Sequence, residues 1–292
     1  MKGIDVSMWQ GSIDFAKVKN SGMDFVIINA GYGKEINQKD KYFEQNYYSA
    51  KSAGLYVGAY WYSYASSVEN AIREAQTCIE AIKGKQFDFP IYFDIEEQKQ
   101  FQKGRDFCDS IVKAFCNELE KNGYYAGFYI SRSPLQTYIS ESVAKRYALW
   151  IAEYGGKCNY NGQYGMWQYS SEGNVPGVNG NCDMNIAYID YPSIIQKGFN
   201  GYQIKSVDEI ANEIIQGKWG NGDERKQKLV RSGYDYNSVQ QKVNEILKRK
   251  SVDEIAYEVI QGKWGNGIER KQKLEAAGYN YSEVQNRVNK LM

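Results

Sequence analysis

Short apolar runs alternate with longer amphipathic patterns from residue 3 to residue 188. Apolar positions at helical spacing fill 41–53, 67–83 and 105–122, between runs with the length and the β-branched and aromatic content of strands. This alternation favours a parallel sheet, and eight strands suffice to close it into a barrel. After residue 130 the runs follow one another too closely for full helices, so an irregular second half is expected. The predicted strands are 3–6, 25–30, 56–62, 90–96, 126–131, 148–152, 165–169 and 183–188.

A second pattern is a repeat whose copies start 45 residues apart, at Ser206 and at Ser251. Ser206-Val-Asp-Glu-Ile-Ala recurs from Ser251, and Gln216-Gly-Lys-Trp-Gly-Asn-Gly recurs from Gln261. Such a period marks one supersecondary unit that is used twice. A unit of about 40 residues is small for an independent fold, so each core must be compact.

Each copy of the repeat carries the signals of three helices. Ser206 with Glu209 three residues later forms a capping-box pattern, which Ser251 repeats. Gly217 and Gly233 stand where a helix ends in a left-handed residue. One apolar face is predicted for the last helix of the first copy, made by Val239, Val243 and Leu247.

These patterns divide the chain into four segments. A barrel is predicted for 1–196 and a linker for 197–203, where glycine and polar residues gather. Three-helix bundles are predicted for 204–249 and 250–292. The predicted fold class is therefore α/β, with an irregular TIM-like barrel followed by two small helical bundles.

Composition excludes several classes of function. The formal net charge of +1 gives no electrostatic case for nucleic acid, and no apolar run approaches membrane-spanning length. Histidine is absent, which removes His-dependent catalysis and His-containing metal sites, so neither a metal nor a cofactor is expected. The five cysteines show no C-x-x-C spacing and are expected to be free thiols.

Two acidic residues end the fourth predicted strand. Asp94 and Glu96 are two residues apart, so on a strand both side chains project from the same face, roughly 6–7 Å apart. At that separation one carboxylate can stay ionised while its neighbour holds a proton. Acids at the end of a barrel strand indicate catalysis, and cleavage of a glycosidic bond uses such a pair.

Further motifs occur in a fixed order along the first part of the chain. They are Gly3-Ile-Asp-Val-Ser, Trp9-Gln-Gly, Gly58-Ala-Tyr-Trp-Tyr, Phe93-Asp-Ile-Glu, Leu149-Trp-Ile-Ala, Trp167-Gln-Tyr-Ser and Asp183-Met-Asn. On these motifs, 1–192 resembles the lysozymes of glycoside hydrolase family 25. The resemblance implies a flattened barrel of five β/α units followed by three more strands. It also implies cleavage of the β-1,4 bond between N-acetylmuramic acid and N-acetylglucosamine.

The same resemblance implies roles for individual residues. Glu96 is expected to be the general acid, and Asp94 its partner as a nucleophile, as the group that positions water, or as support for the substrate's N-acetyl group. Asp5 and Asp183, which match the family's further carboxylates, are expected to tune Glu96 and to stabilise positive charge on the sugar. Substrate contacts are expected from Tyr62, Tyr32, Trp150, Tyr129 and Gln168.

The repeats resemble three-helix cell-wall-binding repeats of phage lysozymes. Trp219 and Trp264 can stack on sugar or hold the helices together, while Arg225 and Arg270 can bind wall carboxylates. The combination is similar to a phage or prophage endolysin that acts on Gram-positive peptidoglycan. Because no signal peptide opens the chain, we expect synthesis in the host cytoplasm and release through a separate membrane-permeabilising protein.

Three other functions fit parts of the sequence. A chitinase-like hydrolase is disfavoured, because the acidic motif lacks the further Asp residues that such enzymes place ahead of the acid. A wall-binding barrel without catalysis is disfavoured, because all four carboxylates of the family are present. Helical repeats can also serve as protein–protein adaptors, which binding to purified wall sacculi would separate from wall recognition.

Overall fold

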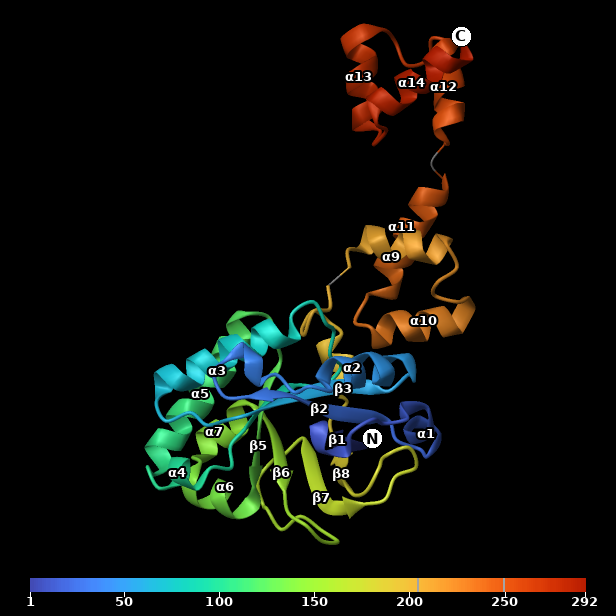
Figure 1. The fold of residues 1–292 in the computed structure, drawn as a ribbon. Coiled ribbons are helices and arrows are strands. Elements are labelled where there is room, and N and C mark those ends of the chain that lie inside the picture. The colour runs from blue at the N-terminus through green and yellow to red at the C-terminus, as the bar shows by residue number, and fades with distance from the viewer. Residues whose placement is uncertain (204, 249) are drawn as a thin grey trace. The chain divides into compact units, whose positions relative to one another are not determined.

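The computed structural model describes residues 1–203, 205–248 and 250–292, and it divides into two compact units at residue 204. The first unit holds all eight strands and the second unit is helical (Figure 1). No helix among the described residues is long and apolar enough to cross a membrane.

The strands of the first unit form a closed barrel in sequence order, β1 to β8, as the sequence predicts. Neighbouring strands from β1 to β7 are parallel, whereas β8 is antiparallel to both β7 and β1. The strands are β1 Lys2–Val6, β2 Phe25–Tyr32, β3 Tyr56–Tyr62, β4 Ile91–Asp94, β5 Ala126–Ser131, β6 Ala148–Ala152, β7 Met166–Gly173 and β8 Cys182–Ala187.

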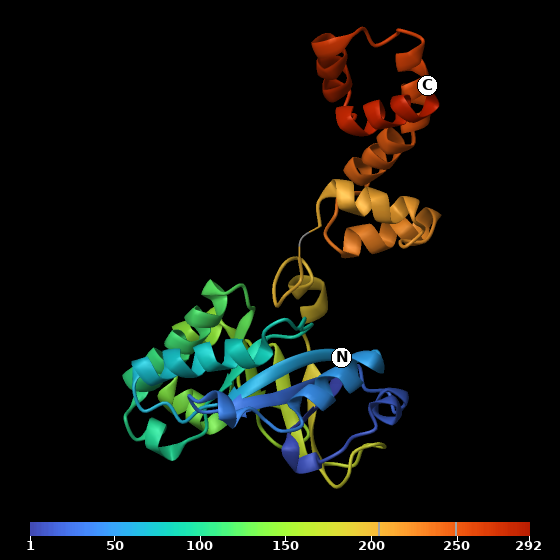
Figure 2. The same ribbon diagram turned by 45° about the horizontal axis from the view of Figure 1, so that its top comes forward.

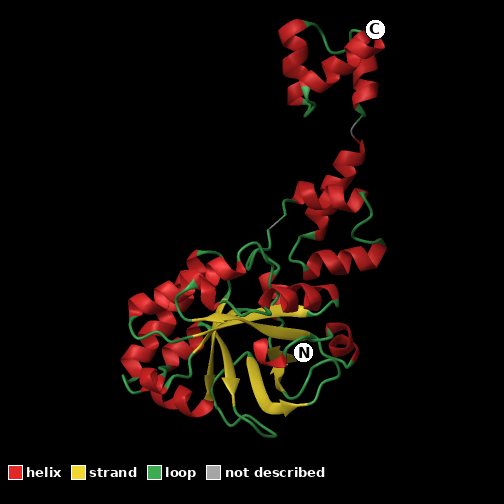
Figure 3. Ribbon diagram, viewed as in Figure 1, coloured by secondary structure: helices red, strands yellow, loops and turns green. Residues whose placement is uncertain are grey.

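Helices cover the barrel beside β2 to β5, while loops join β6, β7 and β8 (Figure 3). The predicted helices appear as α2, α3 and α5. The helices among the described residues of this unit are η1 Met8–Gln10, α1 Phe15–Asn20, η2 Ile36–Gln38, α2 Phe43–Ser52, α3 Val68–Ile82, α4 Gln98–Phe101, α5 Arg105–Lys121, α6 Arg132–Tyr138, α7 Glu141–Arg146 and α8 Tyr191–Ile195.

Alternation along the strands separates two apolar layers. In β2, Phe25 and Ile27 belong to a cluster inside the barrel, whereas Val26 and Ile28 pack in the cluster under the helices. Both faces of the strand are buried, which is why it appears in the sequence as one continuous apolar run. The interior cluster fills the barrel, so chemistry is confined to its two ends.

Residues 197–203 are attached to the barrel. Asn200 is buried; its side-chain amide donates to the Phe89 carbonyl (2.8 Å) and its side-chain oxygen accepts from the Tyr125 backbone N–H (2.7 Å). The Tyr202 hydroxyl donates to Asp88 (2.5 Å). The first compact unit therefore continues beyond the predicted boundary at residue 196.

The second unit contains two sets of three helices (Figure 2). Both predicted capping boxes are present, and Gly217 and Gly233 have the left-handed φ of 80°. Val239 and Val243 are buried, but Leu247 is 66% exposed, and Ile246 packs against the core in its place. The helices are α9 Val207–Ile215, α10 Gly222–Arg231, α11 Tyr236–Lys248, α12 Val252–Ile260, α13 Gly267–Ala276 and α14 Tyr281–Leu291.

Candidate active site

Four carboxyl groups come from strands at one end of the barrel. Asp94 is the last residue of β4, and Glu96 follows two residues later. Asp5 lies near the end of β1 and Asp183 near the start of β8. Because β8 is antiparallel to β1, Asp5 and Asp183 are direct cross-strand partners. The reversed strand thus supplies a fourth acid to the face where the parallel strands end.

Asp5 and Asp183 lie opposite each other on neighbouring strands. Asp5 is buried, and its Oδ1 accepts hydrogen bonds from Gln168 Nε2 (2.9 Å) and Asn185 Nδ2 (2.7 Å). Burial and the charge of Asp183 raise the pKa of Asp5 well above its usual range. Burial also raises the pKa of Asp183, against the opposing effect of a hydrogen bond with Asp5. Two neighbouring carboxyls in a buried site resist simultaneous ionisation, so the pair keeps a proton more readily than two separate acids would.

Asp94 is the most isolated acid of the cluster. Its side chain is 5% exposed, and its Oδ1 has no hydrogen-bond partner. Burial, followed by the charges of Glu96 and Asp5, raises its pKa well above the usual range. Burying a carboxyl oxygen without a hydrogen-bond partner costs free energy. The surrounding fold therefore holds Asp94 in a position that disfavours its charged form.

Glu96 is the accessible acid of the cluster. Strand β4 ends before it, although Ile95 N–H still donates to the Tyr129 carbonyl (3.1 Å) and keeps the backbone extended. The Glu96 side chain is exposed to solvent at the mouth of the barrel. The protein atoms around it, and then the charges of Asp183 and Glu97, raise its pKa. This combination of access and raised pKa suits a group that gives a proton to a substrate.

Three of the predicted substrate contacts lie behind Asp5 instead of on an open surface. Trp150, Tyr129 and Gln168 are all buried. Tyr129 Oη donates to Gln168 Oε1 (2.9 Å), whose amide binds Asp5, and Trp150 Nε1 donates to Asn185 Oδ1 (2.8 Å). The side chains turn inward because the barrel is closed, and they position Asp5.

The other two predicted contacts line an open groove. A groove of about 480 Å³ lies over the ends of β1, β2 and β3, and both Tyr32 and Tyr62 line it together with Tyr64 and Trp9. Tyr62 Oη donates to Glu97 Oε1 (3.0 Å). Burial, the bond to Glu97 and then the charges of Asp94 and Glu96 raise the pKa of Tyr62. The groove therefore runs beside the carboxylates. Trp9, which is 81% exposed, offers a flat face for a sugar ring.

Sequence reasoning missed three residues of this site. Asn185 joins Asp5 to Trp150, Glu97 binds Tyr62, and Trp9 stands in the groove. The period of two along β8 puts Asn185 on the same face as Asp183, and Trp9 belongs to the Trp9-Gln-Gly motif. The positions of Glu97 and Trp9 depend on how the chain turns after a strand.

The predicted wall-binding residues of the repeats make structural contacts. Trp219 packs against its helical core and donates to Glu213 (3.0 Å), as Trp264 does to Glu258 (3.1 Å). Arg225 donates to the Gly220 carbonyl (3.0 Å), and Arg270 donates to the Gly265 carbonyl (3.0 Å) and to Gln285 (3.2 Å). Both arginines therefore close the glycine-rich turn that precedes their helix.

The barrel and its carboxylates define a class of protein, the barrel glycosidases, in which acids at strand ends act on a sugar bound across the mouth. The model of glycosyl hydrolases family 25 matches residues 4–178, and the chain belongs to this family. The CW_7 repeat matches residues 208–247 and 253–292. Within the described part of the chain, no group of three or more Cys, Asp or Glu side chains is arranged to hold a metal ion.

Similar proteins include lysozymes of bacteria and of a phage. An autolytic lysozyme of Clostridium acetobutylicum is 34% identical over 186 residues, which are 63% of this chain and 55% of that protein. The lysozyme of Streptococcus phage Cp-7 is 38% identical over 97 residues, 30% of this chain and 25% of that protein. The crystal structure of a Streptomyces coelicolor lysozyme aligns with a TM-score of 0.58 at 25% identity, over 69% of this chain and 98% of that one. The chain thus spans only about half of the clostridial relative.

Proposed function

We propose that this protein is a peptidoglycan hydrolase that cleaves the β-1,4 bond between N-acetylmuramic acid and N-acetylglucosamine. The observation that carries the proposal is the pairing of an exposed acid of raised pKa, Glu96, with a buried one, Asp94, beside an aromatic groove. The lysozymes among the similar proteins support peptidoglycan as the substrate.

In the proposed reaction, Glu96 gives its proton to the glycosidic oxygen as the bond to the anomeric carbon breaks. Positive charge then develops on the sugar ring, and the negative charge of the carboxylate cluster stabilises it. Water supplies the hydroxyl that ends on the anomeric carbon, and its proton returns to the cluster. Asp94 acts as a nucleophile, orients that water, or holds the substrate's N-acetyl group.

The helical repeats are proposed to bind the Gram-positive cell wall. Two linked copies of one module add avidity when the wall presents repeated ligands within their reach. The protein is proposed to be made in the host cytoplasm and to reach the wall through a separate membrane-permeabilising protein. Neither nucleic acid nor membrane insertion is part of the proposal.

The test of bond specificity is mass spectrometry of fragments released from purified peptidoglycan after borohydride reduction. Reduced muramic acid at the new ends is expected. Reduced glucosamine ends would make the protein a glucosaminidase and reverse the assignment of the two sides of the cleft. Intact glycan strands would contradict hydrolysis altogether.

The variant Glu96→Gln keeps the shape of the proposed acid but cannot give a proton. The rate of fragment release is expected to fall by about 10²–10⁴-fold, the usual contribution of a general acid. Binding to wall sacculi is expected to stay at the wild-type level. Glu172→Gln, at an exposed position of β7, is the matched control and should lyse normally. Normal lysis by Glu96→Gln would remove Glu96 from the role of acid.

A further inference from the structure

The segment that carries Glu96 is attached to the barrel at both of its ends. It begins at Asp94, the last residue of β4, and runs to Gln100 in the short helix α4. The exposed Glu96 side chain stands in the middle of this acid-bearing segment, residues 94–100. Because β4 ends at Asp94, the position of Glu96 depends on the contacts that fix the two ends of the segment.

Ser63, the residue that follows β3, binds both ends of the acid-bearing segment. Its backbone N–H donates to the Asp94 carbonyl (3.0 Å). Its buried hydroxyl and its carbonyl accept hydrogen bonds from the side-chain amide of Gln100 (3.0 and 3.3 Å). The segment therefore forms a loop whose two ends meet at a single residue next to the neighbouring strand.

Gln100 closes this loop as a buried donor. Its side chain is 3% exposed, and its amide nitrogen also donates to the Ala65 carbonyl (3.2 Å). Two amide hydrogens thus face three oxygens of the turn 63–65, which orients the amide because unpaired buried acceptors destabilise a fold. The backbone N–H of Gln100 donates to the Glu97 carbonyl (2.8 Å), so the clamp reaches the residue next to Glu96.

Helix α3 holds the turn 63–65 from the other side. The Ser63 hydroxyl donates to the buried Glu74 carboxylate (2.7 Å), which also accepts a hydrogen bond from the Tyr64 backbone N–H (2.9 Å). Ser63 cannot move away from Gln100 without breaking these bonds. The turn is thus a fixed support, and Gln100 joins the acid-bearing segment to it.

We propose that Gln100 is a positioning residue of the active site, which holds Glu96 in the place relative to Asp94 that proton transfer to the glycosidic oxygen requires. This inference rests on the proposed function, in which Glu96 is the general acid. Gln100 acts through the backbone of the acid-bearing segment and, being buried, touches no substrate. Because a small displacement of a reacting group can cost much of the rate, losing the clamp should impair the step that needs the proton.

The test compares two leaving groups in the full chain carrying Gln100→Met, in which a side chain of similar length has no N–H to donate. Soluble glycan fragments need a proton on the departing sugar oxygen. The 4-nitrophenyl β-glycoside of N-acetylglucosaminyl-N-acetylmuramic acid needs none, because nitrophenolate leaves as a stable anion. The ratio of kcat/KM for glycan to kcat/KM for the aryl glycoside should fall by about 10- to 100-fold. Partial unfolding lowers both values equally and leaves this ratio unchanged.

Glu96→Gln calibrates the ratio, since it removes the proton itself. A wild-type ratio in Glu96→Gln would contradict the proposed function, in which Glu96 is the acid. A ratio that falls in Glu96→Gln but stays at the wild-type value in Gln100→Met would overturn only the role of Gln100. Ser63→Ala removes one of the three oxygens that Gln100 binds, so it should lower the ratio by a smaller factor. It tests the same clamp if Gln100→Met does not fold.

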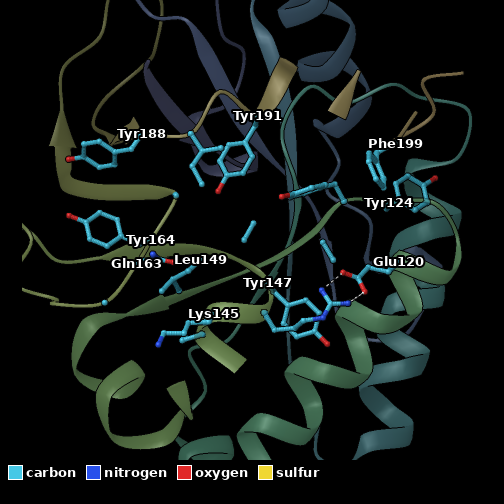
Figure 4. A pocket seen from close by; sticks show the side chains of 18 residues that line it. Glu120, Tyr124, Lys145, Tyr147, Leu149, Gln163, Tyr164, Tyr188, Tyr191 and Phe199 are labelled. Carbon is cyan, nitrogen blue, oxygen red and sulfur yellow. Dashed lines mark hydrogen bonds and ion pairs between the residues drawn. The ribbon is translucent and has the colours of Figure 1, made fainter. Parts of the chain in front are cut away.

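Tyr147→Phe is the matched control for the loss of a buried side chain's hydrogen bond. Tyr147 lies at the base of the barrel, the end opposite the carboxylates, where it lines a cavity together with Glu120 and Tyr164 (Figure 4). Its hydroxyl donates to Asn117 Oδ1 (2.7 Å). The variant should lose stability but keep the wild-type ratio. A ratio that falls as far as in Gln100→Met would overturn the proposal, because any such loss would then disturb proton transfer.

Discussion

The closeness of the four acids at the mouth of the barrel affects the pKa of each one. Burial, mutual repulsion or both raise the pKa of Asp5, Asp94, Glu96 and Asp183. Losing a proton from any one of them makes the next loss harder. Glu96 is the most exposed member, so it can exchange a proton with a substrate, while the protein atoms around it and the charges of Asp183 and Glu97 keep its pKa raised.

Asp183→Asn tests this coupling between carboxylates. The charge of Asp183 helps to raise the pKa of Glu96, so removing that charge lowers it, and Glu96 loses its proton at lower pH than in the wild type. The alkaline limb of the pH profile of kcat/KM should therefore move to lower pH. The maximal rate should fall by about 10²-fold, because the variant lacks a carboxylate that stabilises the positive charge on the sugar ring.

The measurement is cleavage of soluble glycan fragments between pH 4 and 9. Asp106→Asn, at an exposed position in the first turn of α5, provides the control and should leave both limbs in place. An alkaline limb that stays fixed in Asp183→Asn would show that the charge of Asp183 does not reach Glu96.

Single site residues can be predicted from the sequence where they are spaced two apart along a strand and so share one face. Asp94 and Glu96 could be found because they are two residues apart at the end of an apolar run. Trp150, Tyr129 and Gln168 could not be assigned as supports of Asp5, because that role depends on closure between β1 and β8. Closure brings together residues more than 160 positions apart, and no local pattern records it.

Helix α3 carries a buried acid that is separate from the catalytic cluster. Glu74 accepts hydrogen bonds from Ser63 Oγ (2.7 Å) and from the Tyr64 backbone N–H (2.9 Å). Gln100 from α4 donates to the same Ser63 hydroxyl (3.0 Å). This network fixes the end of β3 and thereby one side of the aromatic groove. Burial raises the pKa of Glu74 to about 7.

Glu74→Gln should change how stability depends on pH. The folded pKa of Glu74 lies above its usual value of 4.5, so its contribution to stability is present below about pH 4.5 and is lost as pH rises through about 7. Glutamine imitates the protonated form at every pH. The free energy of unfolding of the variant minus that of the wild type should therefore rise by about 3 kcal/mol as the pH increases from 5 to 8.

Urea unfolding of both proteins at a series of pH values measures this difference. Glu80→Gln on the same helix is the control, because residue 80 is exposed and should give a difference that does not vary with pH. A constant difference between Glu74→Gln and wild type across the range would show that Glu74 stays ionised in the folded protein.

The elements themselves could largely be predicted. Strand β3 has the predicted bounds, and α5 ends one residue short of prediction, because apolar periodicity and glycine stops specify such elements locally. Strand β4 is shorter than predicted and ends at Asp94, since pairing with β3 and β5 stops there. The exposure of Leu247 shows a similar limit, because a helix can extend past the core that covers its first turns.

At the scale of the whole molecule, the repeats are predicted to matter most on intact cells. Removing residues 205–292 should weaken lysis of whole cells by about 10²-fold or more, since tethering raises the local concentration of enzyme. Cleavage of soluble glycan fragments should stay within twofold of the full chain. Lysis and fragment assays run in parallel give the comparison, and equal losses in both would mean that the repeats serve only to stabilise the barrel.

The division into barrel and repeats could be predicted from the repeat itself, but its boundary could not. Residues 197–203 have a linker's composition, yet Asn200 and Tyr202 bind the barrel through a few specific hydrogen bonds. Such bonds depend on partners more than 70 residues away in the sequence, so composition does not reveal them.

The reversal of β8 has a consequence for how such proteins can be assembled. Because β8 is antiparallel to both of its neighbours, the chain leaves this last strand at the base of the barrel, at Tyr188, and not at the mouth. A domain fused there is joined to the face that carries no catalytic acid. Recombination can therefore exchange the C-terminal modules of this barrel without disturbing the carboxylates at its mouth.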